Sequence, residues 1–298
     1  MSRPAVILDV DGTLVDSNDA HARAWVEAFA ESGIQVDYER VRRSIGMGGD
    51  KLMPNVAGIT EETSQGKRIS ERRGEIFTSR YLPQLTAFPR VRELVERFVR
   101  DGFTVVVASS AQEDELELLL ERAGVADLIK SSTSSDDAER SKPDPDIVSA
   151  ALKRSRAAAR SAVMLGDTPY DVEAALRTGV AIVGVECGGW QREDLRGAAE
   201  VYASPAEILD HYDDSLFARL RDASALDIDP AEPRPLFDMN RVFFIAAGVA
   251  GIALLALALR AISRRRSQAG DDEQVEGHRP GLGPRERERL RHIIERTS

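Results

Sequence analysis

Two acidic residues follow a short apolar run near the start of the chain. Asp9 and Asp11 come directly after Ala5–Leu8 and precede Gly12, which permits a sharp turn, and Thr13, which offers a hydrogen-bond donor. Carboxylates two residues apart on an extended chain point to the same side, where their repulsion is costly unless a cation or proton lies between them. A magnesium ion would relieve it, because magnesium prefers oxygen ligands. A plain Asp-Gly turn is the alternative, but the whole motif behind a buried strand is more specific.

A second pair of acids lies far along the chain, at Asp167 and Asp171. Carboxylates four residues apart lie on one face if Asp171 falls in the first turn of a helix. From there they could complete a metal site with the first acidic motif. The alternative is structural, with Asp167 capping the helix and Asp171 interacting with the helix dipole.

Two further motifs supply groups that suit a phosphate. Ser109 and Ser110 end an apolar run, and a hydroxyl at a strand end beside free helix amides suits phosphate oxygens. A serine in that place caps a helix equally well. Lys142 precedes a helix start, where its charge could neutralise a phosphoryl group and an attacking carboxylate. Most lysines are instead solvated, so neither motif is specific alone.

Four short apolar runs rich in Val, Ile and Ala place these motifs in a common frame. Each run is bounded by Asp, Ser or Gly, which is typical of buried strands in a parallel sheet. Helical patterns separate the runs, and this alternation predicts a doubly wound, Rossmann-like α/β fold with its site at the carboxyl ends of the strands. The predicted strands are Ala5–Leu8, Thr104–Ala108, Ala162–Leu165 and Ala181–Val185, and the predicted helices are Val91–Arg100, Glu115–Ala123, Pro145–Arg154 and Tyr170–Arg177.

Residues 16–85 interrupt the alternation, because they contain no convincing strand. An all-helical insertion directly after the first strand predicts a lid, or cap, over the site. The α/β core would then comprise residues 1–15 and 86–211. The predicted cap helices are His21–Ser32, Asp37–Ser44, Asp50–Val56 and Glu61–Leu82.

The four motifs, in this order, resemble the haloacid dehalogenase superfamily, in the helical-cap subgroup of phosphoglycolate phosphatases and β-phosphoglucomutases. The resemblance covers about residues 4–211. It implies a phosphatase in which Asp9 becomes an aspartyl-phosphate, while Asp11 protonates the leaving alcohol and then activates water. It also implies that side chains at the strand ends hold the phosphoryl group. These are Ser109 and Lys142, with Gly12, Thr13 and Ser110 as neighbouring substrate-binding residues.

The same resemblance implies a magnesium cofactor. Its ligands would be the Asp9 carboxylate, the backbone carbonyl of Asp11 and the Asp167 carboxylate, with Asp171 as a nearby or water-mediated ligand. Magnesium would lower the repulsion between carboxylate and phosphate. The cap would exclude water and select the leaving group.

Several cap residues bear on the substrate. His21 resembles a β-phosphoglucomutase residue at the same distance from the nucleophile, and Gly46–Lys51 resembles the specificity loop of capped phosphatases, which gives Gly48, Gly49 and Lys51 as substrate-binding candidates. For His21 and Lys51 the alternative is an ordinary surface helix residue. Lys51 is also the candidate for a Schiff base, as in phosphonate hydrolysis.

The choice within the family rests on an acid and an arginine. Asp11 argues against dehalogenation, because the dehalogenases lack an acid there. Mutases carry an arginine in the specificity loop, whereas this chain has none there and offers only Arg73, loosely aligned, in compensation. A phosphatase for a small metabolite such as 2-phosphoglycolate is therefore favoured over a sugar-phosphate mutase. The hinge Phe88–Arg90 departs from the Pro-Gly usual in the family.

Beyond the core, the sequence predicts a linker over residues 212–240 and a transmembrane helix over 241–262. The apolar run Val242–Leu259 would span about 27 Å as a helix, close to the thickness of a bilayer's hydrocarbon core. A buried core helix is the alternative. Residues 263–298 form a polar tail.

If residues 242–259 attach the chain to a membrane, two signals in the sequence disagree about its orientation. The arginines after the run place its C-terminal side in the cytoplasm, while the lack of an evident signal peptide places the catalytic domain there as well. We expect a tail-anchored protein with a cytoplasmic catalytic domain.

The bulk composition limits the partners. A net charge of −10 argues against nucleic acid. The single cysteine, Cys187, fits a reducing compartment and is expected to be a small buried hydrophobe. A membrane-tethered, non-catalytic regulator is the rival from another functional class, and the oligomeric state stays open.

Overall fold

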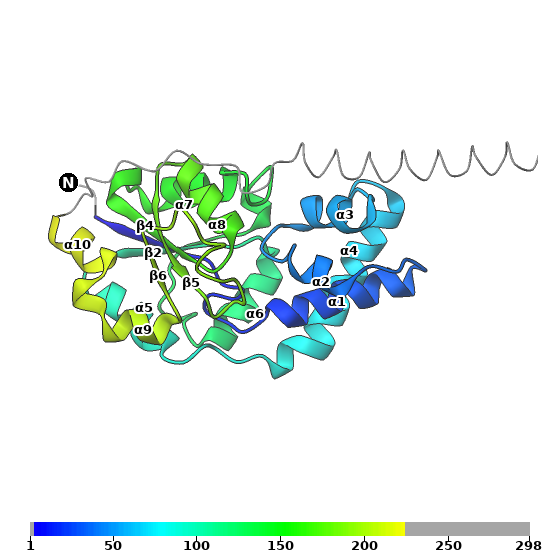
Figure 1. The fold of residues 1–298 in the computed structure, drawn as a ribbon, viewed down its shortest axis with the longest axis horizontal. Coiled ribbons are helices and arrows are strands. Elements are labelled where there is room, and N and C mark those ends of the chain that lie inside the picture. Colours follow the sequence, from blue (N-terminus) through cyan, green and yellow to red (C-terminus); the bar gives the residue numbers. More distant parts are fainter. Residues whose placement is uncertain (1–2, 224–298) are drawn as a thin grey trace, which may run out of the picture. The chain divides into compact units, whose positions relative to one another are not determined.

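A six-stranded parallel sheet forms the centre of the molecule, which we describe over residues 3–223 of a computed structural model (Figure 1). The strand order is β3-β2-β1-β4-β5-β6, so the direction of winding reverses between β1 and β4. Ligands of doubly wound sheets bind outside the carboxyl ends of the strands at such a switch point. The strands are β1 (Ala5–Leu8), β2 (Thr104–Ala108), β3 (Ser132–Thr133), β4 (Ala162–Gly166), β5 (Ala181–Val185) and β6 (Glu200–Tyr202).

Alternate side chains of each strand face opposite sides of the sheet and form two hydrophobic layers. In β1, Val6 and Leu8 belong to one buried cluster, whereas Ala5 and Ile7 belong to the other. Helices cover both faces, as Figure 1 shows. The first face carries α5 (Val91–Arg100), α6 (Glu113–Ala123), α9 (Pro205–Asp210) and α10 (Leu216–Ala223), and the second carries α7 (Asp146–Ser155) and α8 (Pro169–Arg177).

The predicted α/β core is confirmed in its main elements. All four predicted strands are present, with β4 reaching one residue further, to Gly166. The predicted core helices correspond to α5, α6, α7 and α8 within two residues at each end. Sequence analysis missed β3 and β6. These edge strands have two and three residues and lack the continuous apolar run that a strand buried on both faces requires.

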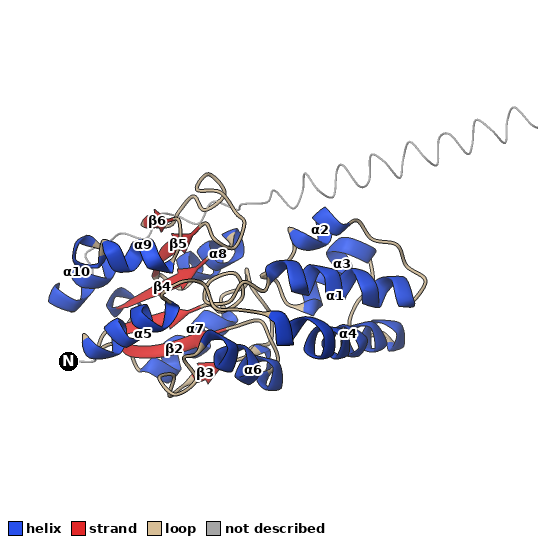
Figure 2. Cartoon of the chain, turned by 90° about the horizontal axis from the view of Figure 1, so that it is seen from below, coloured by secondary structure: helices blue, strands red, loops and turns tan. Residues whose placement is uncertain are grey.

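The cap helices gather into a bundle at one end of the sheet, as Figure 2 shows. Trp25 and Phe29 join Met53 and Ile69 in one hydrophobic cluster. The predicted helix Glu61–Leu82 is divided: Thr63 caps α4 by accepting from the Gly66 amide, and a π-helical turn follows Ile76. The cap elements are α1 (Asn18–Glu31), α2 (Tyr38–Arg42), α3 (Gly49–Ala57), α4 (Ser64–Ile76), the π turn η1 (Phe77–Tyr81) and the 3-10 turn η2 (Leu82–Gln84).

The two connections between core and cap run side by side. The Asp16 amide donates to the Thr86 carbonyl at 3.1 Å, and the Phe88 amide donates to the Leu14 carbonyl at 3.0 Å. Arg90, which stands where the family usually has glycine, adopts a left-handed φ of 61° at the start of α5. Ion pairs with side chains of α5 and α9 accompany this conformation, which is unfavourable for a residue with a Cβ atom.

The predicted linker over residues 212–240 begins too early. Residues 212–223 form a 3-10 turn, η5 (Tyr212–Asp214), followed by α10, and Phe217 is fully buried with its ring 4.7 Å from that of Phe98. This short amphipathic helix completes one face of the core.

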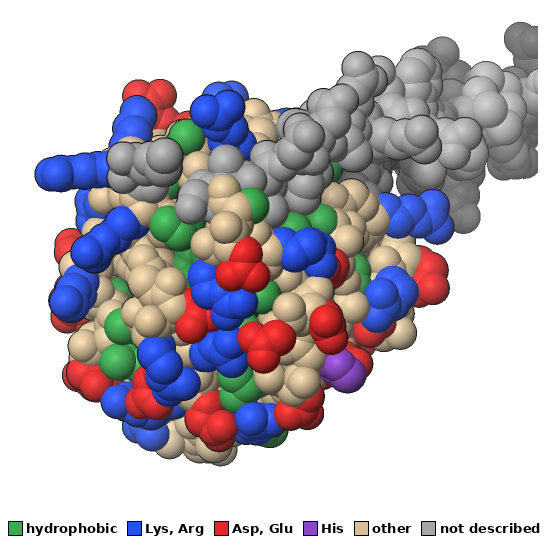
Figure 3. Space-filling model, turned by 90° about the vertical axis from the view of Figure 1, so that its left-hand side faces the viewer, with side chains coloured by type: hydrophobic (Ala, Val, Ile, Leu, Met, Phe, Trp, Pro, Cys, Tyr) green, Lys and Arg blue, Asp and Glu red, His purple; other side chains and the backbone are tan. Residues whose placement is uncertain are grey.

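On the surface that Figure 3 presents, acidic and basic side chains are interspersed. Many such side chains form ion pairs, for example Arg97 and Asp213 at 2.7 Å.

Within residues 3–223, no helix has the length and apolar character needed to cross a membrane. The predicted transmembrane segment 241–262 and the polar tail 263–298 lie outside the described residues, as does the rest of the predicted linker.

Candidate active site

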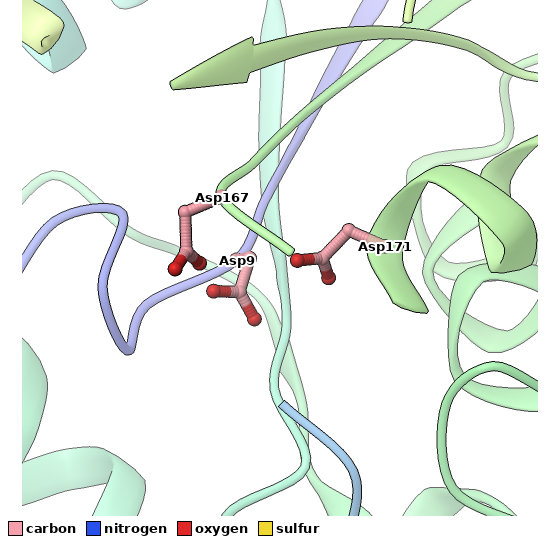
Figure 4. A group of neighbouring side chains, drawn as sticks. All are labelled: Asp9, Asp167 and Asp171. Carbon is pink, nitrogen blue, oxygen red and sulfur yellow. The ribbon is translucent and has the colours of Figure 1, made fainter. Parts of the chain in front are cut away.

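Three buried carboxylates converge at the carboxyl ends of β1 and β4, as Figure 4 shows. Asp9 follows β1, Asp167 follows β4, and Asp171 lies in the first turn of α8. One oxygen from each carboxylate lies within 4.8 Å of the others. The structure therefore brings together acids from both ends of the sequence at the switch point of the sheet.

Lys142 and Thr13 hold the Asp9 carboxylate from its two sides. The Lys142 ammonium lies 2.5 Å from Asp9 Oδ1 and 2.8 Å from Asp171 Oδ1, and the lysine side chain is only 1% exposed. The Thr13 hydroxyl donates to Asp9 Oδ2 at 3.1 Å. Since an unpaired buried ammonium would be very costly, Lys142 is an integral part of this cluster and not one of the solvated lysines.

The crowding of acids shifts their pKa values. Burial raises the pKa of Asp9 to about 7; the Lys142 ammonium opposes this rise, while Asp171 and Asp11 add to it. Burial and the neighbouring Asp9 and Asp171 also raise the pKa of Asp167 well above its usual range. For Lys142 the effect of burial is outweighed by the two carboxylates, which raise its pKa. The site thus carries negative charge that one lysine does not fully compensate.

Asn18, a residue that sequence analysis missed, orients Asp167. Its amide nitrogen donates to Asp167 Oδ2 at 2.9 Å and to the Gly188 carbonyl at 3.0 Å. The space around it is tight, because a Cβ on Gly12 would lie 2.3 Å from Asp167 Oδ2 and a Cβ on Gly188 would lie 1.7 Å from it. The position of Asn18 just after the first motif could have suggested a role, but its partners are about 150 residues away.

Asp171 serves the helix as well as the cluster. The Thr168 side chain, and not that of Asp167, is the N-cap of α8: it accepts from the Asp171 amide at 3.2 Å. In return Asp171 Oδ2 accepts from the Thr168 amide at 3.0 Å, which completes a capping box. The predicted alternative, in which Asp167 caps the helix, is therefore wrong. Asp171 takes part in the capping box with one oxygen, while its other oxygen pairs with Lys142.

Asp11 has its hydrogen-bond partners at the start of the cap. His21 Nε2 lies 2.7 Å from Asp11 Oδ1, and the Ser17 hydroxyl donates to the same oxygen at 2.5 Å. The His21 ring is buried and stacks on Phe77 at 3.9 Å. Although burial acts in the opposite direction, His21 and Ser17 lower the pKa of Asp11. The predicted alternative, an ordinary surface residue, is therefore wrong for His21, which is buried and hydrogen-bonds Asp11.

The serines at the end of β2 lie at different depths. Ser109 is fully buried and its hydroxyl accepts from the Ala111 amide at 3.1 Å, whereas Ser110 is half-buried and donates to the Gly46 carbonyl of the cap at 3.3 Å. Ser109 thus lies at the carboxyl end of β2, as predicted, and Ser110 links the core to the cap through its hydrogen bond to Gly46.

The predicted cap residues contact the core. The Lys51 ammonium donates to the Ser141 carbonyl at 2.6 Å and pairs with Asp144. Arg73 pairs with Glu115 of α6 at 2.8 Å, with its guanidinium over the Trp25 ring. Lys51 and Arg73, both predicted to bind substrate, therefore already have acidic partners in the core. Gly48 and Gly49 begin α3, where a Cβ on either would meet close neighbours, Ser141 and Glu61.

The donor set fits a hard divalent cation. Three buried carboxylates, of which Asp9 and Asp167 have raised pKa values, supply oxygen ligands, which magnesium and calcium prefer over softer donors. Asn18 Oδ1 is buried and has no hydrogen-bond partner among the described residues, so it could accept from a metal-bound water. Cys187, half-buried nearby, donates to the Gly12 carbonyl at 3.4 Å; burial raises its pKa, so it remains a neutral thiol.

Comparisons with known proteins show which proteins this chain resembles. The model of a family described as haloacid dehalogenase-like hydrolase matches residues 6–185, more than half of the chain. A phosphoglycolate phosphatase of Rhodospirillum rubrum is 30% identical over 69% of this chain and 89% of its own length. "Probable phosphatase IndB" of Dickeya dadantii is 29% identical over 66% and 86%. The crystal structure of a hydrolase from Pseudomonas syringae matches with a TM-score of 0.67 and 31% identity, over 71% of this chain and 99% of that one.

Proposed function

Because this chain belongs to the haloacid dehalogenase-like hydrolase family, we propose that it is a phosphatase that hydrolyses a small organic phosphate monoester. The observation that carries the proposal is the buried Asp9 carboxylate, held between Lys142 and Thr13 and next to two further acids. A carboxylate fixed in this way is a suitable nucleophile toward phosphorus. Relatives that are named phosphatases support the same reaction.

The reaction would proceed in two displacements. In the first, an Asp9 oxygen forms a bond to phosphorus, the bond from phosphorus to the leaving oxygen breaks, and Asp11 gives its proton to the leaving alcohol. In the second, a water oxygen bonds to phosphorus, the bond to Asp9 breaks, and Asp11 takes up the proton. Splitting one difficult step in this way is the advantage of covalent catalysis.

His21 and Ser17 are suited to manage the Asp11 proton. Both contact Asp11 Oδ1, and they lower its pKa against the effect of burial. With an imidazole at 2.7 Å, the proton that Asp11 delivers can be shared with His21. The pair would therefore stabilise the Asp11 carboxylate once its proton has gone to the leaving alcohol, until Asp11 takes up the proton of the attacking water.

Asp9 and Asp167, with the Asp11 backbone carbonyl, would hold a magnesium ion. When bound, the ion would reduce the repulsion between Asp9 and the negatively charged phosphate. Asp171 is committed to Lys142 and to the Thr168 cap, so it would act from a nearby position. Lys142 neutralises Asp9, and Ser109 at the end of β2 would bind a phosphoryl oxygen, with Ser110 and the amides around Gly12 and Thr13 as further contacts.

The substrate would be a small phosphorylated metabolite, with 2-phosphoglycolate as the first compound to test, because a relative is a phosphoglycolate phosphatase. A sugar-phosphate mutase is the alternative within the same chemistry. Transfer of the phosphoryl group from a bisphosphate to a second hydroxyl, without release of inorganic phosphate, would distinguish it.

Hydrolysis of p-nitrophenyl phosphate by the full-length chain tests the proposal. Activity should require magnesium, disappear with EDTA, and be lost in D9N. Turnover that is indifferent to Asp9 would refute the mechanism. Failure of the folded protein to turn over p-nitrophenyl phosphate and a panel of metabolite phosphates would leave the non-catalytic regulator as the better reading.

Attachment to a membrane through residues 242–259 forms a separate part of the proposal and rests on the sequence of that run alone. The catalytic domain would face the cytoplasm. Recovery of the full-length chain in the membrane fraction, released by detergent but not by high salt, is the expected result. Full solubility without detergent would refute it.

A further inference from the structure

The cap loop Gly46–Lys51 makes hydrogen bonds and an ion pair with the core segment 141–144, which carries Lys142. The Lys51 ammonium donates to the Ser141 carbonyl at 2.6 Å and pairs with Asp144. Asp50 accepts from the Ser141 hydroxyl at 2.5 Å and from the Ser141 amide at 3.3 Å. The cap therefore binds the residue before Lys142 through its amide, carbonyl and hydroxyl groups.

The loop fits closely against this segment. A Cβ atom on Gly48 would lie 2.7 Å from the Cβ of Ser141, so glycine is the residue that this approach allows. On the other side of the loop, the Gly46 carbonyl accepts from the Ser110 hydroxyl at 3.3 Å. The loop thus touches two of the core motifs that converge on Asp9.

Asp144 is a fixed point of the core. Arg177 of α8 donates to its second oxygen at 3.0 Å, so the core also holds this carboxylate from a side chain of its own. Lys51 therefore pairs with an acid that a core side chain also holds. The Lys51 side chain is 24% exposed and so is partly shielded from water. An ion pair in such surroundings is worth more than one on the open surface.

We propose that Lys51 is a positioning residue that couples docking of the cap to the placement of Lys142 beside Asp9. With the cap docked, Ser141 and Asp144 are both held, and Lys142 between them has its ammonium against Asp9 and Asp171. When the cap moves away, the segment loses the contacts to Asp50 and Lys51. The inference rests on the proposed function only for the role of Lys142 in the reaction.

This assignment differs from the two roles that the sequence suggests for Lys51, substrate ligand and Schiff-base amine. Both would require the ammonium to be available to the substrate. Its contacts are instead a backbone carbonyl and a carboxylate of the core segment. Lys51 acts on the reaction through the segment that holds Lys142.

Lysine acetylation followed by mass spectrometry measures this coupling without reference to activity. The chain has five lysines, Lys51, Lys67, Lys130, Lys142 and Lys153, so every site can be followed. N-hydroxysuccinimide acetate would be applied to the full-length chain with magnesium, and the exposed Lys67, Lys130 and Lys153 provide internal standards. In K51M, Lys142 should react about tenfold faster than in the original chain, as expected for loss of a charged, partly buried hydrogen bond.

A double-mutant cycle with D144N isolates the pair. D144N should also raise the reactivity of Lys142. K51M should have a smaller effect in D144N than in the original chain, because the Lys51–Asp144 ion pair is already lost there. R72M, which breaks an ion pair between Arg72 and Glu31 within the cap, is the matched control and should leave Lys142 protected. Unchanged labelling of Lys142 in K51M, or additive effects in the double variant, would overturn the proposal.

Kinetics separate positioning from substrate binding. If Lys51 positions Lys142, K51M should lower kcat by about tenfold for both p-nitrophenyl phosphate and 2-phosphoglycolate. A rise in KM for 2-phosphoglycolate alone, with kcat unchanged, would show that Lys51 is a substrate ligand and would refute the inference. Inactivity of the original chain would concern the proposed function, while the labelling result would still decide the coupling.

Discussion

Replacing Asp9 by Asn should stabilise the metal-free protein at alkaline pH while it abolishes activity. Asp9 is 6% exposed and lies among other acids, and its pKa is raised from 3.8 to about 7. Holding it ionised in the fold therefore costs up to about 4 kcal/mol, at 1.36 kcal/mol for each pKa unit. An uncharged amide of the same size avoids that cost and can still accept a hydrogen bond from Thr13.

The effect depends on pH in a definite direction. The pKa of Asp9 in the fold lies above its value in the unfolded chain. The contribution of Asp9 to stability is therefore complete below about pH 4 and is lost as the pH rises through about 7. D9N should thus exceed the original chain in melting temperature at pH 8, but not at pH 4. With roughly 2–4 °C for each kcal/mol in a domain of this size, the difference at pH 8 should approach about 10 °C.

Thermal unfolding in EDTA at both pH values measures the difference, and added magnesium provides a second test. The ion should raise the melting temperature of the original chain at pH 8 and have little effect on D9N, since a ligand that binds the folded state stabilises it. D37N is a control that removes one charge at the N-cap of α2, where Asn caps as well as Asp. Equal or lower stability of D9N at pH 8 would refute the argument that uncompensated negative charge strains this site.

Three further predictions concern residues around the site and the end of the core. N18A should weaken magnesium binding by about tenfold in calorimetry, since residues that orient ligand carboxylates have effects of this size; unchanged affinity would exclude its role in orienting Asp167. H21N should lower kcat by about 10- to 100-fold and move the limb of the pH–rate profile that reports Asp11 to higher pH, because His21 lowers the pKa of Asp11; an unshifted profile would separate His21 from Asp11. F217A should destabilise the protein by about 3–5 kcal/mol in urea unfolding, as for other buried aromatic residues; a loss under 1 kcal/mol would return α10 to the linker.

The core was predictable from sequence because its signals are local. A buried parallel strand needs a continuous apolar run, and Ala5–Leu8 and Ala181–Val185 have it, so their bounds could be read directly. The edge strand β6 is half-exposed and three residues long, and so carries no such signal. The helix α10 is short and follows several polar residues, so only the packing of Phe217 against Phe98 shows that it belongs to the core.

The partners of the cap residues could not be predicted from local sequence patterns. His21, Lys51 and Arg73 were identified as candidates, but the sequence does not reveal which acid each would meet. Their partners are 10, 93 and 42 residues away, and these distances in sequence are bridged only when the cap docks on the core. Pairings of this kind depend on tertiary structure, and no periodicity or motif of a single segment contains them.

Asp171 combines both kinds of information. The spacing from Asp167 placed it correctly in the first turn of a helix, where a local rule predicts capping, and its Oδ2 atom does accept from the Thr168 amide. The long-range partner Lys142 decides the direction of the remaining oxygen, 2.8 Å from the ammonium. Because one carboxylate fixes both the start of α8 and the lysine that neutralises Asp9, capping and catalysis are not competing explanations here. The capping box supplies the rigidity that places the Lys142 charge beside Asp9, the proposed nucleophile.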